Sequence, residues 1–554
     1  MTSYTKNNIK KLLITIVIIV ILNIVGNQFF KRFDLTSDNR YTLSETTLNI
    51  LKNVKEPLII DIFLEGEFPA QFKRLQSETR QILEEFRAYN QNIIFRFNDP
   101  LADASTSEQY MAELMGYGMT PTNINQNVKG KKSLTPVFPW AIANIGEKSV
   151  IVPLLVNNFG NNPDQNINQS VQLLEFAFTD AITKLTTIEK KKIAILKGNG
   201  EINDKYLADF LISTKEYYAL GEFNLDSLKG DLPKTLENLK RFEATIVAKP
   251  TEAFSDEEKY ILDQYIMGGG KVIWLIDQVN IDLEHLQNPE QVSLATPIDL
   301  NLDDMFFKYG VRINTRLVQD LLSTPITAKS AEGADFPIDW LYSPIIKSEE
   351  NHPINKNVNL VKLEFANQID TLKNNIKKTV LLKSSPQSRV VGAPVLVGLN
   401  QFMQELDESV FTNGNQITGA LLEGNFTSAF KNRVKPFAIA KPADEGVANK
   451  MIVIADGDIV NYNSVNKKPL VNGLDQWTQQ VYGNKDFLMN CVNYLLDDKG
   501  LINIRSKNIE LPLLDDKKVA DKYTFSQIIT VGLPIVILGI FGFVFTFLRK
   551  KKYS

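Results

Sequence analysis

The sequence predicts an α/β protein that carries a membrane helix at each end. Two long apolar runs, at 12–30 and 528–548, enclose the rest of the 554-residue chain. Between them, short runs rich in valine and isoleucine alternate with longer segments in which apolar residues recur at helical spacing. This alternation is typical of α/β domains. The fold class therefore follows from the two runs and from the alternation between them.

The C-terminal run has the length and composition of a transmembrane helix. It contains twenty-one residues without a charge and ends at Arg549, which is followed by three lysines. At about 1.5 Å per residue it would extend roughly 30 Å, the thickness of the hydrocarbon core of a bilayer. We therefore expect a transmembrane helix at 528–548 and a basic tail at 549–554.

The N-terminal run, 12–30, admits two interpretations. Basic residues precede it, as they do in both signal peptides and membrane anchors: Lys6, Lys10 and Lys11. A cleaved signal peptide would show small residues at a cleavage site, whereas here the apolar character continues to Phe30. We expect a retained transmembrane helix at 12–30, after a short tail at 1–11.

Basic residues flank both runs on their outer sides. Because basic flanks remain in the cytoplasm, we expect both termini on the cytoplasmic side of a membrane and the segment 31–527 on its far side. This segment holds all 64 acidic residues of the chain and is mildly acidic. A nucleic-acid partner is therefore not expected.

Composition limits the chemistry that the chain can support. With 44% hydrophobic and 23% charged residues it resembles folded proteins, and its length allows two or three domains. Cys491 is the single cysteine, so neither an intramolecular disulfide nor a cysteine-based metal site can form. His285 and His352 lie in polar, loop-like contexts and are expected to be exposed. No cofactor is expected.

The segment 31–190 predicts a small α/β domain. A β-α-β unit, a hairpin and a helix are expected: strands at 58–64 and 93–97 around a helix at 71–89, hairpin strands at 136–145 and 148–155, and a helix at 171–185. This order resembles a thioredoxin-like layer, although the absence of a Cys-x-x-Cys motif excludes redox chemistry. The asparagine-rich stretch 157–168 is expected to be a loop.

The segment 191–506 predicts a larger α/β domain with a mostly parallel, doubly wound, Rossmann-like sheet. Strands are expected at 192–198, 244–248, 271–276, 358–365 and 451–455. Helices are expected at 256–267, 301–309 and 486–496. A charged, proline-bearing tether at 507–527 leads from this domain to the second membrane helix.

One stretch beside the first membrane helix resembles a known family. It reads Phe33-Asp-Leu-Thr-x-Asp-x-Arg-Tyr-Thr-Leu-Ser-x-x-Thr47, and its Ser44 is expected to cap a helix. The stretch is similar to the signature of the GldG family of gliding-motility-associated ABC transporter accessory proteins. Later motifs follow the order of that family: Gly268-Gly-Gly-Lys-Val-Ile-Trp274, Leu422-Glu-Gly-x-Phe-x-Ser-Ala-Phe430, Val453-Ile-Ala-Asp-Gly-Asp458 and Gly483-Asn-x-x-Phe-Leu-x-Asn490.

The resemblance has implications for fold and partners. It implies that the larger domain contains a glutamine-amidotransferase-like sheet. It also implies that the chain works in gliding motility and the associated secretion, together with a multi-span permease and a separate cytoplasmic ATPase. The amides of Asn23, Asn27 and Gln28 are candidates for contacts with the permease, because polar side chains in a bilayer are favoured where they face another helix.

Three aspartates are the candidate ligand-binding residues. Asp456 and Asp458 follow the strand at 451–455, and Asp277 follows the strand at 271–276. Ligands of α/β sheets bind at the carboxyl ends of strands, so these side chains could hold a hard cation through their oxygens. The alternative is that they cap turns by accepting hydrogen bonds from backbone N–H groups.

Other motifs give no catalytic site. The glycines at 268–270 precede a strand, whereas a P-loop precedes a helix, and they are expected to end a helix. Cys491 shares a helical face with Phe487, Tyr494 and Leu495 and is expected in the core rather than at a nucleophile turn. The chain is therefore not expected to be an enzyme.

Three functional hypotheses follow. The leading one is a non-catalytic, membrane-anchored accessory subunit of an ABC-type transporter complex. The second is a solute-binding protein with a ligand cleft between its domains. The third is a metal-dependent envelope hydrolase that uses Asp456 and Asp458.

Overall fold

The structure is a computed structural model of the chain, described for residues 12–20, 42–103, 105, 107–128, 131–158, 161–226, 230–329, 335–347, 352–402, 406–460, 464–465, 468–469, 471–505 and 522–553. The chain divides into two compact units. One contains residues 1–40 and 508–554, and the other contains residues 41–507.

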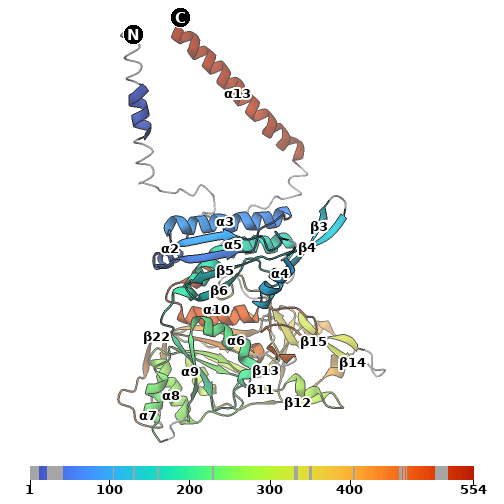
Figure 1. The fold of residues 1–554 in the computed structure, drawn as a ribbon. Coiled ribbons are helices and arrows are strands. Elements are labelled where there is room, and N and C mark those ends of the chain that lie inside the picture. The colour runs from blue at the N-terminus through green and yellow to red at the C-terminus, as the bar shows by residue number, and fades with distance from the viewer. Residues whose placement is uncertain are drawn as a thin grey trace. The chain divides into compact units, whose positions relative to one another are not determined.

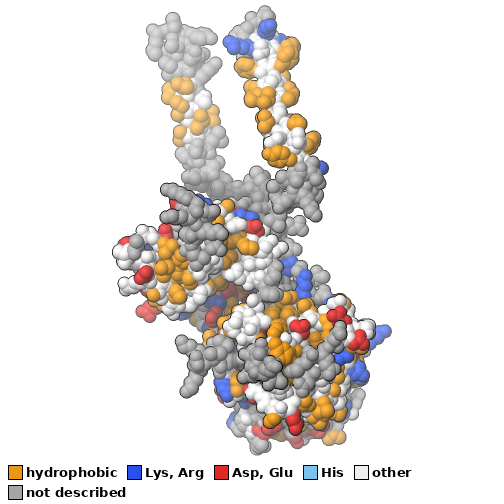
Figure 2. All heavy atoms as spheres, turned by 90° about the vertical axis from the view of Figure 1, so that its right-hand side faces the viewer, with side chains coloured by type: hydrophobic (Ala, Val, Ile, Leu, Met, Phe, Trp, Pro, Cys, Tyr) orange, Lys and Arg blue, Asp and Glu red, His pale blue; other side chains and the backbone are white. Residues whose placement is uncertain are grey.

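The first unit holds the long C-terminal helix α13 (Tyr523–Tyr553). Within it, Tyr523–Lys551 contains an 18-residue stretch with a mean hydropathy of 2.6 and is the one segment of the described residues that is long and apolar enough to cross a membrane. Its hydrophobic side chains are exposed along the helix, and Lys and Arg side chains gather at one end (Figure 2). The predicted span 528–548 lies inside this helix.

Residues 12–20 of the same unit are also helical. The remainder of the predicted N-terminal span, residues 21–30, lies outside the described residues, and Asn23, Asn27 and Gln28 lie there with it. The N-terminal transmembrane helix and its contacts therefore stay predictions.

In the second unit, residues 42–186 form an α/β layer, named here the N-terminal layer (Figure 1). Its four-stranded sheet has the order β2-β1-β5-β6, in which β1 and β2 are parallel and the other pairs are antiparallel. The strands are β1 (Leu58–Ile62), β2 (Ile93–Phe97), β5 (Trp140–Ile145) and β6 (Lys148–Pro153). The expected β-α-β unit and hairpin are present.

One face of this sheet packs against α3 (Ala70–Tyr89) and α5 (Pro163–Thr186), which also contact each other. Successive side chains of a strand alternate between faces, and Leu58, Ile60 and Ile62 all enter this core. The buried core thus lies between the sheet and the two helices.

Smaller elements complete the N-terminal layer. Helix α2 (Glu45–Lys52) begins at the predicted cap, where Oγ of Ser44 accepts a hydrogen bond from N of Thr47 at 3.1 Å. On the opposite face of the sheet, α4 (Ser107–Gly116) packs near Trp140. A separate hairpin is formed by β3 (Thr122–Val128) and β4 (Lys131–Val137).

Helix α5 begins earlier than predicted. Asn162 directly precedes Pro163, the first helical residue. Oδ1 of Asn162 accepts a hydrogen bond from N of Gln165 at 2.8 Å, and Oε1 of Gln165 accepts one from N of Asn162 at 2.9 Å. This reciprocal capping box, with proline at the first position, is a strong helix start. The prediction of a loop across 157–168 was therefore wrong from Pro163 onwards.

Residues 192–496 form the large domain, built on a seven-stranded sheet of order β18-β21-β22-β10-β9-β7-β8. The five strands from β22 to β8 are parallel, and β21 and β18 add antiparallel pairs at one side. The strands are β7 (Lys192–Lys197), β8 (Ala219–Asn224), β9 (Ala244–Ala248), β10 (Lys271–Leu275), β18 (Lys377–Lys383), β21 (Ile417–Thr427) and β22 (Glu445–Ile454). A mostly parallel α/β sheet is thus observed, and β8 and the antiparallel strands β18 and β21 are additions to the prediction.

Helices cover both faces of this sheet. The helices are α6 (Asp204–Tyr217), α7 (Leu232–Leu239), α8 (Asp256–Met267), α9 (Asp303–Tyr309) and α10 (Asn484–Leu496). Trp274 of β10 enters the core beneath α7, α8 and α9, whereas its neighbours Ile273 and Leu275 enter the core beneath α6 and α10. The strand is therefore buried on both faces, which explains its continuous apolar sequence.

A β-rich region between β10 and β21 is missing from the prediction. Its strands are β11 (Val279–Asn280), β12 (Val292–Pro297), β13 (Val311–Asp320), β14 (Ser323–Lys329), β15 (Asp335–Ile346), β16 (Val361–Lys362), β17 (Asn367–Thr371), β19 (Ser388–Gly392) and β20 (Val395–Gly398). They form small antiparallel sheets around a core that includes Trp340 and Phe365. The strand predicted at 358–365 is reduced to β16, so that prediction was wrong in length.

The last helix of the second unit packs against the N-terminal layer. After α10, the short helix α11 (Leu501–Arg505) contacts α2 and α5. Leu501 and Ile504 are buried in the core of that layer. Residues 501–505, placed by the sequence in the larger domain, therefore contribute to the core of the N-terminal layer.

Candidate functional site

The carboxyl ends of three adjacent parallel strands meet at one edge of the large sheet. Strands β9, β10 and β22 pair side by side, and Lys249, Asp277 and Asp456 follow them. This edge is where α/β sheets usually bind ligands. The structure brings Asp277, Asp456 and Asp458 together there, as the sequence places them.

A lysine ammonium group lies among these carboxylates. Nζ of Lys249 is 2.6 Å from Oδ1 of Asp458, 2.6 Å from Oδ1 of Asp282 and 3.6 Å from Oδ2 of Asp277. The side chain of Lys249 is 15% exposed, and its backbone has a positive φ of 50°, which is uncommon outside glycine. The ammonium group therefore occupies the position that a bound cation would take among these oxygens.

The carboxylates also cap the turn that follows β22. Oδ1 of Asp456 accepts hydrogen bonds from N of Asp458 at 2.8 Å and from N of Ile459 at 3.1 Å. Oδ1 of Asp277 accepts one from N of Gly457 at 2.6 Å. These contacts match the alternative in which the aspartates satisfy backbone N–H groups.

Gly457 allows the turn to approach the lysine closely. A Cβ atom at this position would lie 2.7 Å from Cβ of Lys249 and 2.9 Å from Oδ2 of Asp277. Both distances are shorter than van der Waals contact. Glycine is therefore required by the close approach of the backbone.

Burial and charge shift the pKa values of these groups. Burial is the main cause of the raised pKa of Asp277, with the Lys249 ammonium group opposing it. Burial and the neighbouring carboxylates raise the pKa of Asp456 well above its usual range. Burial alone would lower the pKa of Lys249, but the carboxylates of Asp458, Asp277 and Asp282 outweigh it and raise that pKa.

Glu364 adds a further carboxylate to this group. Its backbone N donates to Oδ2 of Asp456 at 2.7 Å. Burial raises the pKa of Glu364 to about 7 against the opposing charge of Lys362, which itself binds Oδ2 of Asp475 at 2.7 Å. The set is named here the carboxyl-edge cluster: Lys249, Asp277, Asp282, Asp456, Asp458 and Glu364.

The chemistry open to this cluster is restricted by its own lysine. Among the described residues, no group of three or more histidine, cysteine, aspartate or glutamate side chains is arranged to hold a metal ion. A cation entering between Asp277 and Asp458 would have to displace the ammonium group of Lys249. The geometry therefore favours a structural role for these aspartates, fixing the strand ends to one another.

Sequence reasoning missed three members of the cluster. Lys249 directly follows a predicted strand that is adjacent to the strand before Asp277, and this placement was a usable signal. Asp282 lies in the β-rich region, where no strand or helix was predicted, and Glu364 lies within the strand predicted at 358–365, which gave no sign that it would approach the aspartates. Their approach to Lys249 depends on long-range packing.

The other predicted residues lie as follows. Cys491 is fully buried, which confirms its predicted core position. His285 is exposed, as predicted. His352 is half-buried with its ring 4.7 Å from the ring of Tyr494, so the prediction of an exposed side chain was wrong there.

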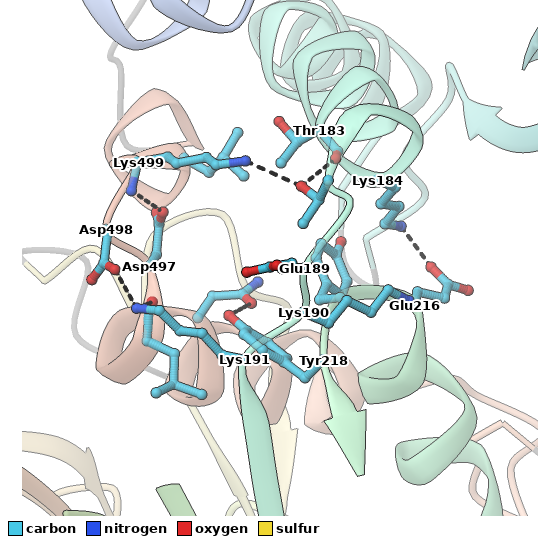
Figure 3. A pocket seen from close by; sticks show the side chains of 15 residues that line it. Thr183, Lys184, Glu189, Lys190, Lys191, Glu216, Tyr218, Asp497, Asp498 and Lys499 are labelled. Carbon is cyan, nitrogen blue, oxygen red and sulfur yellow. Dashed lines mark hydrogen bonds and ion pairs between the residues drawn. The ribbon is translucent and has the colours of Figure 1, made fainter. Parts of the chain in front are cut away.

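A cavity of about 130 Å³ lies where the N-terminal layer meets the large domain (Figure 3). It is lined by the end of α5, the segment between α5 and β7, the end of α6, and the end of α10 with the segment that follows it. A wider groove of about 480 Å³ opens between β6, α5 and α6. Lys184 and Glu216 line both spaces. The cavity is smaller than ordinary small-molecule sites, which measure about 300 to 1,000 Å³.

Comparison with known proteins identifies the family. The family described as "ABC-type uncharacterized transport system" matches residues 190–491, more than half of the chain. The chain belongs to this family. The match covers the large domain and includes every member of the carboxyl-edge cluster. A domain of unknown function, DUF7088, matches residues 37–144 in the N-terminal layer.

Similar proteins are found in sequence and in structure. An uncharacterized protein of Borreliella burgdorferi is 20% identical over 553 residues and covers 97% of both chains. Among solved structures, the N-terminal domain of mmIFT52 aligns with a TM-score of 0.32 and 12% identity, over 55% of this chain and 98% of that one. The Borreliella burgdorferi protein therefore aligns with this chain along nearly the whole length of both.

Proposed function

We propose that this member of the ABC-type transport system family is a non-catalytic, membrane-anchored accessory subunit of an ABC-type transporter complex. The observation that carries the proposal is the family match over residues 190–491. The carboxyl-edge cluster supports it, because the usual ligand position of the sheet is filled by the ammonium group of Lys249. ATP hydrolysis is assigned to a separate chain.

The proposed membrane anchoring rests on the apolar segments near the two ends of the sequence, 12–30 and α13. Helix α13 supplies one candidate span, and its basic end at 549–552 favours a cytoplasmic position. The N-terminal run at 12–30 supplies the second span, preceded by its own lysines. In this arrangement both termini are cytoplasmic and the domains between the spans are periplasmic, at the inner membrane.

The finer assignments rest on the resemblance to the GldG family and on strand order. We place the complex in gliding motility and the associated secretion. We regard the N-terminal layer as thioredoxin-like, since β2-β1-β5-β6 combines a parallel pair with an antiparallel hairpin. The large domain is regarded as Rossmann-like and similar to glutamine amidotransferases.

The partners are a multi-span permease in the membrane and a cytoplasmic ATPase. Contact with the permease is proposed through Asn23, Asn27 and Gln28, whose polar groups are favoured against another helix rather than lipid. Replacing all three with leucine should reduce recovery of the permease with the tagged chain. Replacing Thr15, a polar residue of the same run, with leucine is the matched control.

The proposed role in gliding motility is tested in cells. Cells that lack this chain should lose gliding to the same extent as cells whose partner ATPase carries a substitution of its phosphate-binding lysine. A wild-type copy should restore gliding, and a copy that lacks 523–554 should not. Normal gliding without the chain would contradict the assignment to motility, and the accessory role would then have to serve another transport process.

A further inference from the structure

The large domain is an insertion in the N-terminal layer. The layer begins the described second unit at residue 42, and α11 ends it within the core of the same layer. The large domain lies between these two parts of the chain. Two crossovers join it to the layer: residues 187–191 lead from α5 to β7, and residues 497–500 lead from α10 to α11. Both chain ends that lead toward the anchors therefore leave from the layer.

The two crossovers lie side by side (Figure 3). Nζ of Lys499 donates to Oγ1 of Thr187 at 3.1 Å. Nζ of Lys191 donates to the carbonyl oxygen of Leu496 at 2.8 Å and pairs with the carboxylate of Asp498. Adjacent crossovers between two bodies are the arrangement of a hinge, because the rotation can be absorbed by a few residues at element ends.

Helix α11 is the apolar pivot beside the crossovers. Leu501 and Ile504 are buried in the core of the N-terminal layer, whereas Ile502 is buried in the core of the large domain. Apart from α11, the buried apolar residues described for the layer and for the large domain fall into separate clusters. The two bodies thus keep their own cores and share one short helix, so rotation about it would disturb the cores only around the residues of α11.

Away from the pivot, an ion pair, a hydrogen bond and a cation–ring contact join α5 to α6. Lys184 of α5 binds Oε2 of Glu216 of α6 at 2.6 Å and Oδ2 of Asp180 at 3.2 Å. Tyr217 of α6 donates from its hydroxyl to Oδ2 of Asp180 at 3.0 Å, and Nζ of Lys184 lies 4.4 Å from the centre of the Tyr217 ring. These four residues are named here the latch.

Open space borders the latch on two sides. The groove of about 480 Å³ between β6 and α6 and the cavity of about 130 Å³ at the crossovers both include Lys184 and Glu216 in their walls. The latch therefore bridges a gap instead of lying in a continuous packed interface. Breaking it would expose charged groups and part of the Tyr217 ring to water.

We propose that the large domain rotates against the N-terminal layer about α11 and the paired crossovers, and that the latch holds the closed position seen in this structure. The inference rests on the proposed function, in which the chain is an accessory subunit of a transporter complex and its two membrane spans continue into the N-terminal layer. The large domain would then change its orientation when the layer is moved.

The test is a distance measurement in the purified full-length chain. Spin labels are placed on exposed positions of the two bodies by Glu84→Cys in α3 and Glu237→Cys in α7; the native Cys491 is fully buried and should not react. Pulsed electron resonance then gives the distribution of distances between the labels. The latch is opened in this background by Asp180→Asn combined with Glu216→Gln.

The expected result is a second distance population, displaced by several ångströms, in the latch variant. The matched control is Glu445→Gln, which removes an exposed pair with Lys431 inside the large domain and should leave the distribution unchanged. A latch variant whose distribution superimposes on that of the parent chain would overturn the proposal. If the double variant unfolds, Tyr217→Phe replaces it and is held to the same criterion. Since the purified chain is used alone, the outcome is independent of whether a permease and an ATPase co-purify.

Discussion

The ammonium group of Lys249 lies 2.6 Å from Oδ1 of Asp458, where the carboxyl ends of the central strands meet. The two residues are far apart in sequence. Lys249 follows β9 and Asp458 follows β22, and these two strands lie on either side of β10 in the sheet. Their contact closes the edge at which similar sheets receive ligands. The same contact fixes the turn after β22, whose backbone is held by Asp456.

Removing the lysine should destabilise the large domain. In Lys249→Met, the buried carboxylates of Asp277 and Asp458 lose their opposite charge, and breaking a buried pair in this way typically costs about 3 to 5 kcal/mol. Urea unfolding followed by circular dichroism measures the change. Lys431→Met, which removes the exposed partner of Glu445, is the control and should leave stability almost unchanged. Equal effects of the two substitutions would show that the cluster carries no special stability.

Stability should depend on pH through Glu364. A carboxyl group with a raised pKa holds its proton more tightly in the folded state, so its contribution is complete below the unfolded value of about 4.3 and is lost as the pH rises through about 7. Glu364→Gln mimics the protonated form. Between about pH 5 and pH 8, the wild type should lose about 1 to 3 kcal/mol more than this variant. Parallel pH profiles of the two proteins, measured by urea unfolding, would contradict the raised pKa.

Gly457 should not tolerate a side chain. In Gly457→Ala, the new methyl group would contact Lys249 and Asp277 at distances well below van der Waals contact, and overpacking of this kind costs about 1 to 3 kcal/mol. Gly392→Ala is the matched control, since no atom lies within 4 Å of the added Cβ at that position. Thermal unfolding of both variants measures the difference. A near-neutral Gly457→Ala would mean that the turn can move away from the lysine.

The start of α5 should depend on Asn162. Asn162→Ala removes one half of the capping box and should cost about 1 kcal/mol, with increased hydrogen exchange confined to the first turn of the helix. Asn161→Ala alters the neighbouring exposed amide and serves as the control. Unchanged exchange in the Asn162 variant would indicate that Pro163 alone starts the helix.

Much of the fold could be predicted because its central strands are buried on both faces. The runs at 244–248 and 271–275 are continuously apolar, and α8 carries a complete cap at Ser255. These local signals are strong enough to place elements within a residue or two. The edge strand β8 (Ala219–Asn224), by contrast, is only partly buried and has no apolar run that would identify it.

The β-rich region and the details of the site depend on long-range packing. Strand β16 pairs through only two residues, and Glu364 reaches the cluster because its backbone N meets Asp456 across a long sequence separation. Sequence placed three aspartates at the correct edge from strand order alone. The predicted strand at 244–248 placed Lys249 at a strand end, but its position between the aspartates also depends on the pairing of β9 with β10, which is set by the tertiary fold.

The central claim, that the chain is an accessory subunit of an ABC-type complex, is tested most directly by affinity purification. The tagged full-length chain is recovered from detergent-solubilised membranes, and co-purifying polypeptides are quantified by mass spectrometry against an unrelated tagged protein with a single membrane helix. We predict that one multi-span permease and one separate ATPase are recovered in amounts comparable with the chain. Recovery of neither above the level of the unrelated protein would contradict the account.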